Sequence, residues 1–221
     1  MIDPSCEAPQ SCYGRGTMPF RLVLALALLA IASLARASEI ELAGSEGHPR
    51  DRFPLAVHRA STGDTALDGA VRRALHDWNT VAEAAIGVRA FVEVAEGDKA
   101  HVLLAFPTAP PSRIMGSTRL GADERGVITL PVRVAVFPPT ARGQTAAEVL
   151  LYQVVAHELG HALGLPHTRD PRSLMCCVYG AIDFNDGAVR EAYVAARRNP
   201  DVRSSAGELA EHYRKFWARP P

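Results

Sequence analysis

Apolar residues recur every three to four positions between residues 71 and 85, which is the spacing of an amphipathic helix. Asp68 precedes this run and suits an N-cap, and Gly87 follows it where a helix commonly ends. We therefore predict a helix with one buried face over this stretch. That face comprises Val71, Ala74, Leu75, Trp78, Val81, Ala82 and Ala85.

Five shorter β-rich runs predict strands before and after this helix. The run at 113–120 is short and is expected to form an edge strand, whereas the run at 127–137 is the longest. Glu96-Gly97-Asp98 separates the second and third runs and suits a hairpin-like turn between them. The runs cover 53–59, 88–94, 101–106, 113–120 and 127–137.

The second predicted helix begins at Thr145 and Glu148, which have the spacing of a capping box. Unlike the first helix, it is apolar nearly all round, and such a helix is normally buried in the middle of a domain. It nevertheless contains His157, Glu158 and His161, polar groups that a buried helix would otherwise avoid. These three residues therefore need a chemical reason to be there.

Two more helices are predicted after a loop-rich stretch. The first covers 186–197, and the second begins at another capping box, Ser205 to Glu208. Packing of the second helix on the domain is favoured over a partner-binding role for its apolar face. That face comprises Leu209, Tyr213, Phe216 and Trp217.

The N-terminal region has the pattern of a secretory signal peptide. An unbroken apolar run at 22–32 follows Arg21 and precedes Ala35-Arg36-Ala37, so we expect cleavage after Ala37 and a secreted or periplasmic protein. The alternative is an uncleaved membrane anchor, although the run is shorter than the roughly 20 residues that a span needs. Met18 is the better start of such a segment, which makes residues 1–17 a candidate mis-assigned beginning.

Composition narrows the class of protein further. The 221 residues are 48% apolar, with 24 basic and 24 acidic side chains, which suits one globular domain and gives no sign of a nucleic-acid partner. Cleavage after Ala37 would leave Cys176 and Cys177 as the cysteines of the mature chain. Free buried thiols are the expectation for this pair; the alternatives are a vicinal disulfide or approach of Cys177 to a metal.

The segment from His157 to His167 carries the chemistry. His157 and His161 lie four residues apart on a helix, so both imidazoles project from one face within reach of a single ion. Gly164 lets the chain leave the helix through a turn with positive φ, after which His167 can supply a third nitrogen. Glu158 lies about 100° round the helix from His157 and borders the site without being a ligand.

This arrangement predicts a catalytic zinc site rather than a structural one. Three protein ligands leave the fourth tetrahedral position open for water, and zinc lowers the pKa of that water and polarises a carbonyl. Glu158 would take the proton of the water and pass it to the leaving amine. We therefore expect hydrolysis of amide bonds. The competing interpretation of the His-Glu-x-x-His pattern alone is a pair of satisfied core histidines.

The whole segment, His157-Glu-Leu-Gly-His161-Ala-Leu-Gly164-Leu-Pro-His167, resembles the metzincins and within them a matrixin domain of bacterial type. Met175 lies eight residues after His167, as the methionine of their Met-turn does, and Tyr179 lies where matrixins place a tyrosine in the wall of the specificity pocket. The likeness is strong over 144–193 and weaker, but consistent in the order of elements, over 53–137.

The resemblance implies an α+β fold: a twisted five-stranded mixed sheet, a buried zinc helix and a small C-terminal subdomain. A peptide or protein substrate would lie extended along an edge strand. The resemblance further implies one catalytic Zn²⁺. The loop that binds structural metals in many matrixins is not evident over 107–126. Binding of Ca²⁺ elsewhere, through backbone carbonyls and Asp residues, is the alternative. The propeptide cysteine that blocks the zinc in many matrixins is also not evident. Asp170 is expected in a supporting loop role, and Cys177 replaces the family's usual proline.

The expected organisation follows from these assignments, and the protein is expected to be a monomer. A zinc-bound, non-catalytic binding module of the cell envelope is the alternative to a peptidase, and Glu158 favours the peptidase because an inert module has no need for a carboxylate there. The expected segments are a signal peptide at 1–37, an N-terminal lead at 38–52, the catalytic domain at 53–200 with its zinc helix at 145–163 and Met-turn at 173–179, and a C-terminal helix at 201–221.

Overall fold

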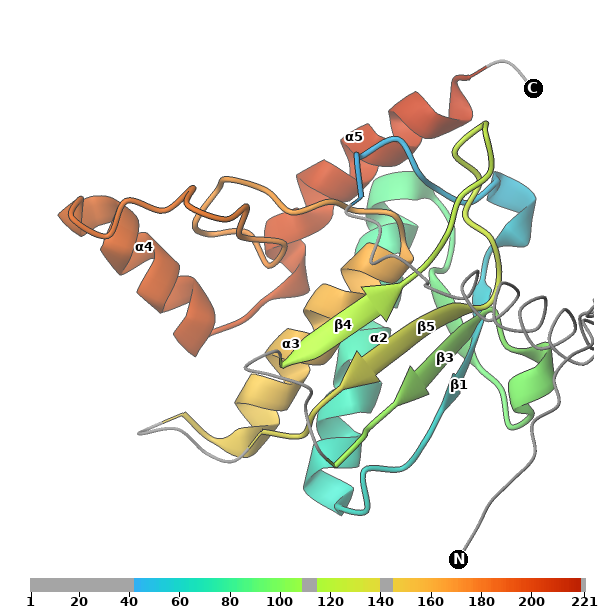
Figure 1. Cartoon of the computed structure of the whole chain (residues 1–221), viewed down its shortest axis with the longest axis horizontal. Coiled ribbons are helices and arrows are strands. Elements are labelled where there is room, and N and C mark those ends of the chain that lie inside the picture. The colour runs from blue at the N-terminus through green and yellow to red at the C-terminus, as the bar shows by residue number, and fades with distance from the viewer. Residues whose placement is uncertain (1–41, 109–114, 140–144, 220–221) are drawn as a thin grey trace, which may run out of the picture. The chain divides into compact units, whose positions relative to one another are not determined.

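A five-stranded mixed sheet lies at the centre of the computed structural model, which describes residues 42–108, 115–139 and 145–219 (Figure 1). The strand order is β2-β1-β3-β5-β4, and β4 alone among these five runs antiparallel to its neighbour. The predicted α+β fold with a mixed sheet is confirmed. The strands are β1 (Leu55–Arg59), β2 (Phe91–Glu93), β3 (Val102–Ala105), β4 (Gly116–Arg119) and β5 (Val132–Val136).

The predicted hairpin between β2 and β3 is wrong. Both strands pair with β1 in parallel, one on each side, so β1 lies between them. The residues of the predicted turn form the start of a short 3-10 helix, η3 (Gly97–Lys99), that carries the chain across. By contrast, β4 lies at the edge of the sheet as predicted, with Thr118 opposite Val134 of β5.

Two long helices, α2 (Thr65–Ile86) and α3 (Ala147–Ala162), lie side by side behind the sheet as Figure 1 shows it. The Trp78 side chain of α2 is fully buried, and its Nε1 donates to the Ala156 carbonyl of α3 at 2.8 Å. This bond fixes the register of the two helices one residue before His157. The apolar face predicted for α2 is buried except at Ala85, which is partly buried.

The helix N-termini differ from their predicted caps. Asp64, not Asp68, caps α2 by accepting from the amides of Ala66 and Leu67. No side chain caps α3, so the predicted capping box at Thr145 does not form. Ser205 likewise precedes the last helix without capping it, because its hydroxyl pairs with Ser173 instead.

The C-terminal part consists of α4 (Gly187–Arg198), a 3-10 turn η4 (Val202–Ser205) and α5 (Ala206–Trp217). Leu209, Tyr213 and Phe216 are buried, so α5 packs on the domain as expected, against α2. The α4 helix has no buried residue. The α4 helix therefore contributes little to the core, and contacts of its partly buried side chains mainly hold it in place.

The N-terminal lead is not loose where the structure describes it. A short 3-10 helix, η2 (Arg50–Arg52), precedes β1, and the fully buried His48 lies just before it. The carbonyl of His48 accepts from Trp217 of α5 at 2.9 Å, and its Nε2 donates to the Ala162 carbonyl at 2.9 Å. Through His48, the N-terminal lead thereby contacts both α5 and the C-terminal end of α3.

The segment expected to be a signal peptide, residues 1–37, lies outside the described residues. Within the described part of the chain, no helix is long and apolar enough to cross a membrane.

Candidate metal centre

Three imidazoles meet at one point beside the sheet. The Nε2 atoms of His157, His161 and His167 are separated by 3.1, 3.2 and 3.2 Å. Within the described residues, this is the one group of three or more histidine, cysteine or acidic side chains whose ligand atoms cluster closely enough to hold a metal ion. Cys177 is not part of the group.

The partners of the other ring nitrogens show which form these histidines take. Nδ1 of His157 lies 2.9 Å from the Leu174 carbonyl, and Nδ1 of His161 lies 2.7 Å from the Leu165 carbonyl. Since a carbonyl only accepts, both Nδ1 atoms carry the proton, and both Nε2 atoms present a lone pair to the centre. Lone pairs that converge in this way repel one another unless a cation lies between them.

The spacing also fits the ion that the sequence predicts. Zinc–nitrogen distances of about 2.0–2.1 Å in a tetrahedral site separate the ligand atoms by about 3.3 Å, close to the spacing found here. Burial lowers the pKa of His157 to about 3 and that of His161 to about 4. The neutral imidazole that a metal requires is therefore the stable form at neutral pH.

The loop after α3 brings the third imidazole back to the helix. Gly164 adopts φ +90°, and a Cβ there would collide with the carbonyl of Glu46. Thr168 then pairs with the strand-like segment after Met175: its amide donates to the Met175 carbonyl, and its carbonyl accepts from Val178, both at 3.0 Å. These two backbone hydrogen bonds of Thr168 thus position His167, the residue before it.

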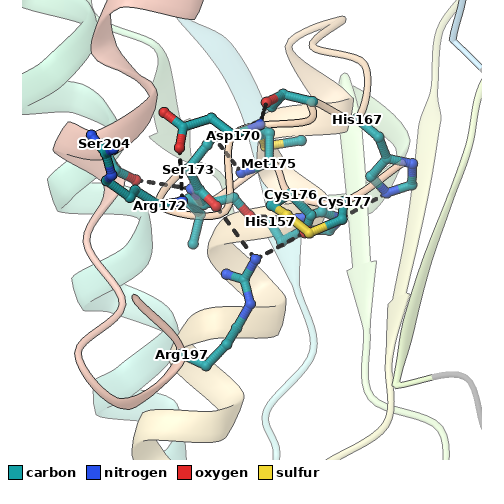
Figure 2. The surroundings of a disulfide bond; sticks show 12 residues. His157, His167, Asp170, Arg172, Ser173, Met175, Cys176, Cys177, Arg197 and Ser204 are labelled. Carbon is teal, nitrogen blue, oxygen red and sulfur yellow. Dashed lines mark hydrogen bonds between the residues drawn. A yellow bond between two sulfur atoms is a disulfide. The ribbon is translucent and has the colours of Figure 1, made fainter. Parts of the chain in front are cut away.

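Met175 is fully buried in the turn whose Leu174 carbonyl accepts a hydrogen bond from His157. Gly160 of α3 leaves room for it, because a Cβ at Gly160 would meet the Met175 sulfur. Outside the turn, Arg197 of α4 donates through Nη2 to the carbonyls of Cys176 at 3.1 Å and Ser173 at 3.4 Å, as Figure 2 shows. Ser204 accepts from the Leu174 amide at 2.9 Å.

Cys176 and Cys177 form a disulfide with each other (Figure 2). The expectation of two free thiols is therefore wrong, and the weighed alternative of a vicinal disulfide is correct. Adjacency along the chain places the two sulfurs within bonding reach. A disulfide sulfur is not a thiolate, so Cys177 has no thiolate to offer the metal centre.

Glu158 is only 6% exposed and lies between α3 and the edge strand. Thr118 of β4 donates its hydroxyl to the Glu158 carboxylate, with Oγ1 2.8 Å from Oε2 and 3.0 Å from the backbone carbonyl of the same residue. Gly116 lies against the carboxylate, because a Cβ there would be 2.7 Å from Oε1. The edge strand β4 and α3 therefore meet at this side chain.

A cleft of about 870 Å³ contains the triad and Glu158. Its floor is α3, one wall is the segment around β4 that includes Ser117, and the other is the chain around Leu174 and Val178 with Arg197 of α4. Tyr179, predicted in the pocket wall, is fully exposed and is not among the residues that line the cleft. The structure brings Val178 to the cleft instead.

Four residues of the centre were not anticipated from the sequence: Gly116, Thr118, Gly160 and Arg197. Gly160 carried a signal, because a glycine inside an apolar helix needs a packing reason. The others carried none, since each acts across a contact between elements more than 20 positions apart in sequence.

Comparison with known proteins agrees with this geometry. The family model for matrixin peptidases matches residues 52–192. Rabbit (Oryctolagus cuniculus) macrophage metalloelastase is 57% identical over 35 residues, which are 16% of this chain and 8% of that protein. A probable matrix metalloproteinase 095L of Invertebrate iridescent virus 3 is 36% identical over 67 residues, 30% of this chain and 18% of that protein.

The chain thus spans less than a fifth of the length of these curated relatives. The solved structure of myroilysin matches with 13% identity and a TM-score of 0.33, over 63% of this chain and 59% of that one; the family assignment does not rest on it. It rests on the family model, which covers more than half of the chain and includes the His157–His167 segment. The chain belongs to the matrixin family of zinc metalloendopeptidases.

Proposed function

We propose that this protein is a zinc-dependent endopeptidase that hydrolyses peptide bonds of proteins outside the cytoplasm. The observation that carries the proposal is the convergence of three Nε2 atoms within 3.2 Å of one another beside a buried glutamate. His157, His161 and His167 would hold one Zn²⁺. When bound, the ion supplies a Lewis acid that polarises the scissile carbonyl and acidifies a water molecule.

Glu158 is the proposed general base and acid. Its carboxylate would take a proton from the attacking water and return it to the nitrogen of the leaving amine, which breaks the peptide bond without a covalent intermediate. The residue comes directly after His157 on α3 and lines the same cleft. That placement supports the role, because the carboxylate borders the centre from the helix that supplies two of its imidazoles.

The proposed substrate is an extended polypeptide. β4 is the last strand of the sheet, and its free edge borders the cleft through Met115 and Ser117. A peptide added along such an edge receives main-chain hydrogen bonds that do not depend on its sequence. This mode suits an endopeptidase, which has to hold a chain on both sides of the cleaved bond. We propose a monomer, because residues of a single chain line the described cleft.

We also propose that residues 1–37 are removed during export, which leaves a mature chain from Ser38 with its catalytic domain at 53–200 and C-terminal helix at 201–221. The apolar run at 22–32 and the Ala35-Arg36-Ala37 sequence support cleavage there. N-terminal sequencing of the exported protein tests this. A mature N-terminus at Ser38 is expected; a retained segment would instead favour the membrane-anchored form.

A peptide-library digestion tests the function. The zinc-loaded wild type is expected to cleave internal bonds, to lose this activity with a chelator and to regain it with zinc. Glu158→Ala should bind zinc but lose at least about a thousandfold in kcat, since the proton transfer has no other carboxylate among the cleft-lining residues described. A wild type that binds one zinc and cleaves nothing would replace the peptidase with a non-catalytic zinc module.

A further inference from the structure

The Glu158 side chain is held from the sheet as well as from its own helix. Thr118 Oγ1 lies 2.8 Å from Glu158 Oε2 and 3.0 Å from the Glu158 carbonyl oxygen, across 40 residues of sequence. The hydroxyl has one proton, and its contact with the carboxylate oxygen is the shorter of the two. Thr118 itself is fixed, because it pairs with Val134 in the antiparallel register of β4 and β5.

Gly116, two residues earlier on the same face of β4, also borders the Glu158 side chain. An added Cβ at Gly116 would be 2.7 Å from Glu158 Oε1, 2.8 Å from its Cγ and 2.7 Å from Cγ1 of Val154. The glutamate side chain therefore occupies the space that a larger residue would fill. If position 116 carried a side chain as position 118 does, the strand would leave no room for the Glu158 carboxylate.

We propose that Thr118 is a positioning residue for the catalytic reaction: its hydroxyl fixes the orientation of the Glu158 carboxylate, so that the strand expected to bind substrate also aligns the base. This inference rests on the proposed function of Glu158. A glutamate has three rotatable bonds, and a loosely held base spends most of its time away from the productive geometry. Thr118 keeps its own proton throughout and acts through Glu158.

Steady-state kinetics of the zinc-loaded full chain test the proposal. Thr118→Val preserves shape and removes the hydroxyl, so kcat should fall about 10- to 100-fold, the usual scale for a lost hydrogen bond to a charged group. KM and the zinc dissociation constant should stay within about twofold. Thr118→Ser, which retains the hydroxyl, should keep kcat within about threefold of wild type. Thr80→Val, an exposed threonine on α2, is the matched control.

Two kinetic outcomes would overturn the proposal. Equal kcat in Thr118→Val and Thr118→Ser would show that the hydroxyl does not matter. A rise in KM alone would make Thr118 a substrate contact rather than a positioning residue. Thr118→Ala gives a second hydroxyl-free variant if the valine variant fails to fold.

A double-mutant cycle on unfolding tests the same contact without turnover, and so separates this inference from the proposed function. Thr118→Ala relative to Thr118→Ser should raise the unfolding constant at least about fivefold more in the wild-type background than in Glu158→Ala. If the wild type cleaves no peptide, the proposed function fails while this coupling still decides the contact. Equal effects in both backgrounds would overturn the inference whatever the activity.

Discussion

Single atoms decide whether the imidazoles can meet. His157 hydrogen-bonds to the Leu174 carbonyl in a turn whose next residue, Met175, packs against α3 at Gly160. A Cβ at Gly160 would meet the Met175 sulfur and lie 3.0 Å from Met175 Cε and 3.1 Å from a ring carbon of Trp78. The side chains of Met175 and Trp78 are both fully buried, so neither can move aside without disturbing the core.

Gly160→Ala is therefore expected to destabilise the fold by about 1–3 kcal/mol, the cost of overpacking a well-filled core. Gly69→Ala on α2 is the matched control, because its Cβ would have only the end of the Arg72 side chain nearby, at 3.9 Å. That variant should be neutral or stabilising by up to about 1 kcal/mol. Urea unfolding measures both. Equal stabilities for the two alanine variants would contradict the packing argument.

His48 gives the fold a dependence on pH. It is fully buried, donates through Nε2 to the Ala162 carbonyl, and receives a hydrogen bond from Arg52 at Nδ1, 3.2 Å away. Burial lowers the pKa of His48 from 6.5 to about 4. The unfolded chain therefore takes up this proton at higher pH than the folded chain. Stability from this residue is complete above pH 6.5 and is lost as pH falls towards 4.

Between pH 7.5 and 4.5, the wild type should lose about 2–3 kcal/mol more unfolding free energy than His48→Gln, at about 1.4 kcal/mol per pKa unit. Comparison with the variant cancels the contributions of the other histidines. Urea unfolding at the two pH values measures the difference. An identical loss in both proteins would mean that His48 titrates normally in the fold.

At the scale of residues, the sequence predicted the cluster of three histidines well and the contacts that support it poorly. His157, His161 and Glu158 were recognisable because their spacing on one helix determines their geometry, whatever surrounds them. Thr118 and Arg197 were not, because a hydrogen bond across the fold leaves no spacing to read. Tyr179 was placed by resemblance alone, and its full exposure shows that local sequence does not determine where a loop side chain points.

Among the elements, α4 is linked to the turn beside the metal centre through Arg197. Arg197 binds the carbonyls on both sides of the Leu174–Met175 turn, and the Leu174 carbonyl in turn holds Nδ1 of His157. Its guanidinium also lies over the ring of Tyr193, 4.9 Å from the centroid. A helix without buried residues is thereby linked to the orientation of a ligand.

Arg197→Gln should weaken zinc binding about 3- to 10-fold, less than the 10- to 100-fold typical of direct partners of a ligand, since the effect passes through the turn. Competition with a chromophoric chelator measures the dissociation constant. Arg198→Gln, on the exposed side of the same helix, should leave it unchanged. Equal zinc affinities for the two variants would show that α4 does not support the turn.

The predicted elements were largely found, while their connections and ends were not. Apolar periodicity located α2, because burial of one face requires it. A long apolar stretch located α3, and β-rich runs located all five strands. The sheet order was beyond the sequence: β1 accepts two parallel neighbours, and nothing local to Glu96-Gly97-Asp98 distinguishes a hairpin from a crossover. The Thr145 and Ser205 boxes failed because spacing permits a cap without requiring it.

For the molecule as a whole, the matrixin match over residues 52–192 includes the whole sheet, α3 and the turn at Met175. The described N-terminal lead and α5 lie largely outside this match, yet they pack on the end of α3 through His48 and Tyr213, whose hydroxyl donates to the Leu163 carbonyl at 2.8 Å. The described parts of the lead and α5 therefore support the end of the helix that carries two of the three histidines.

Zinc titration of the metal-free protein tests the central claim most directly, with peptide cleavage followed at each addition. Cleavage should be absent without metal, rise linearly and reach its plateau at one equivalent of zinc. His161→Ala should show no such rise at the same concentrations, because one of its three ligands is missing. Full cleavage by metal-free protein, or none at one bound equivalent, would contradict the assignment of this chain as a zinc endopeptidase.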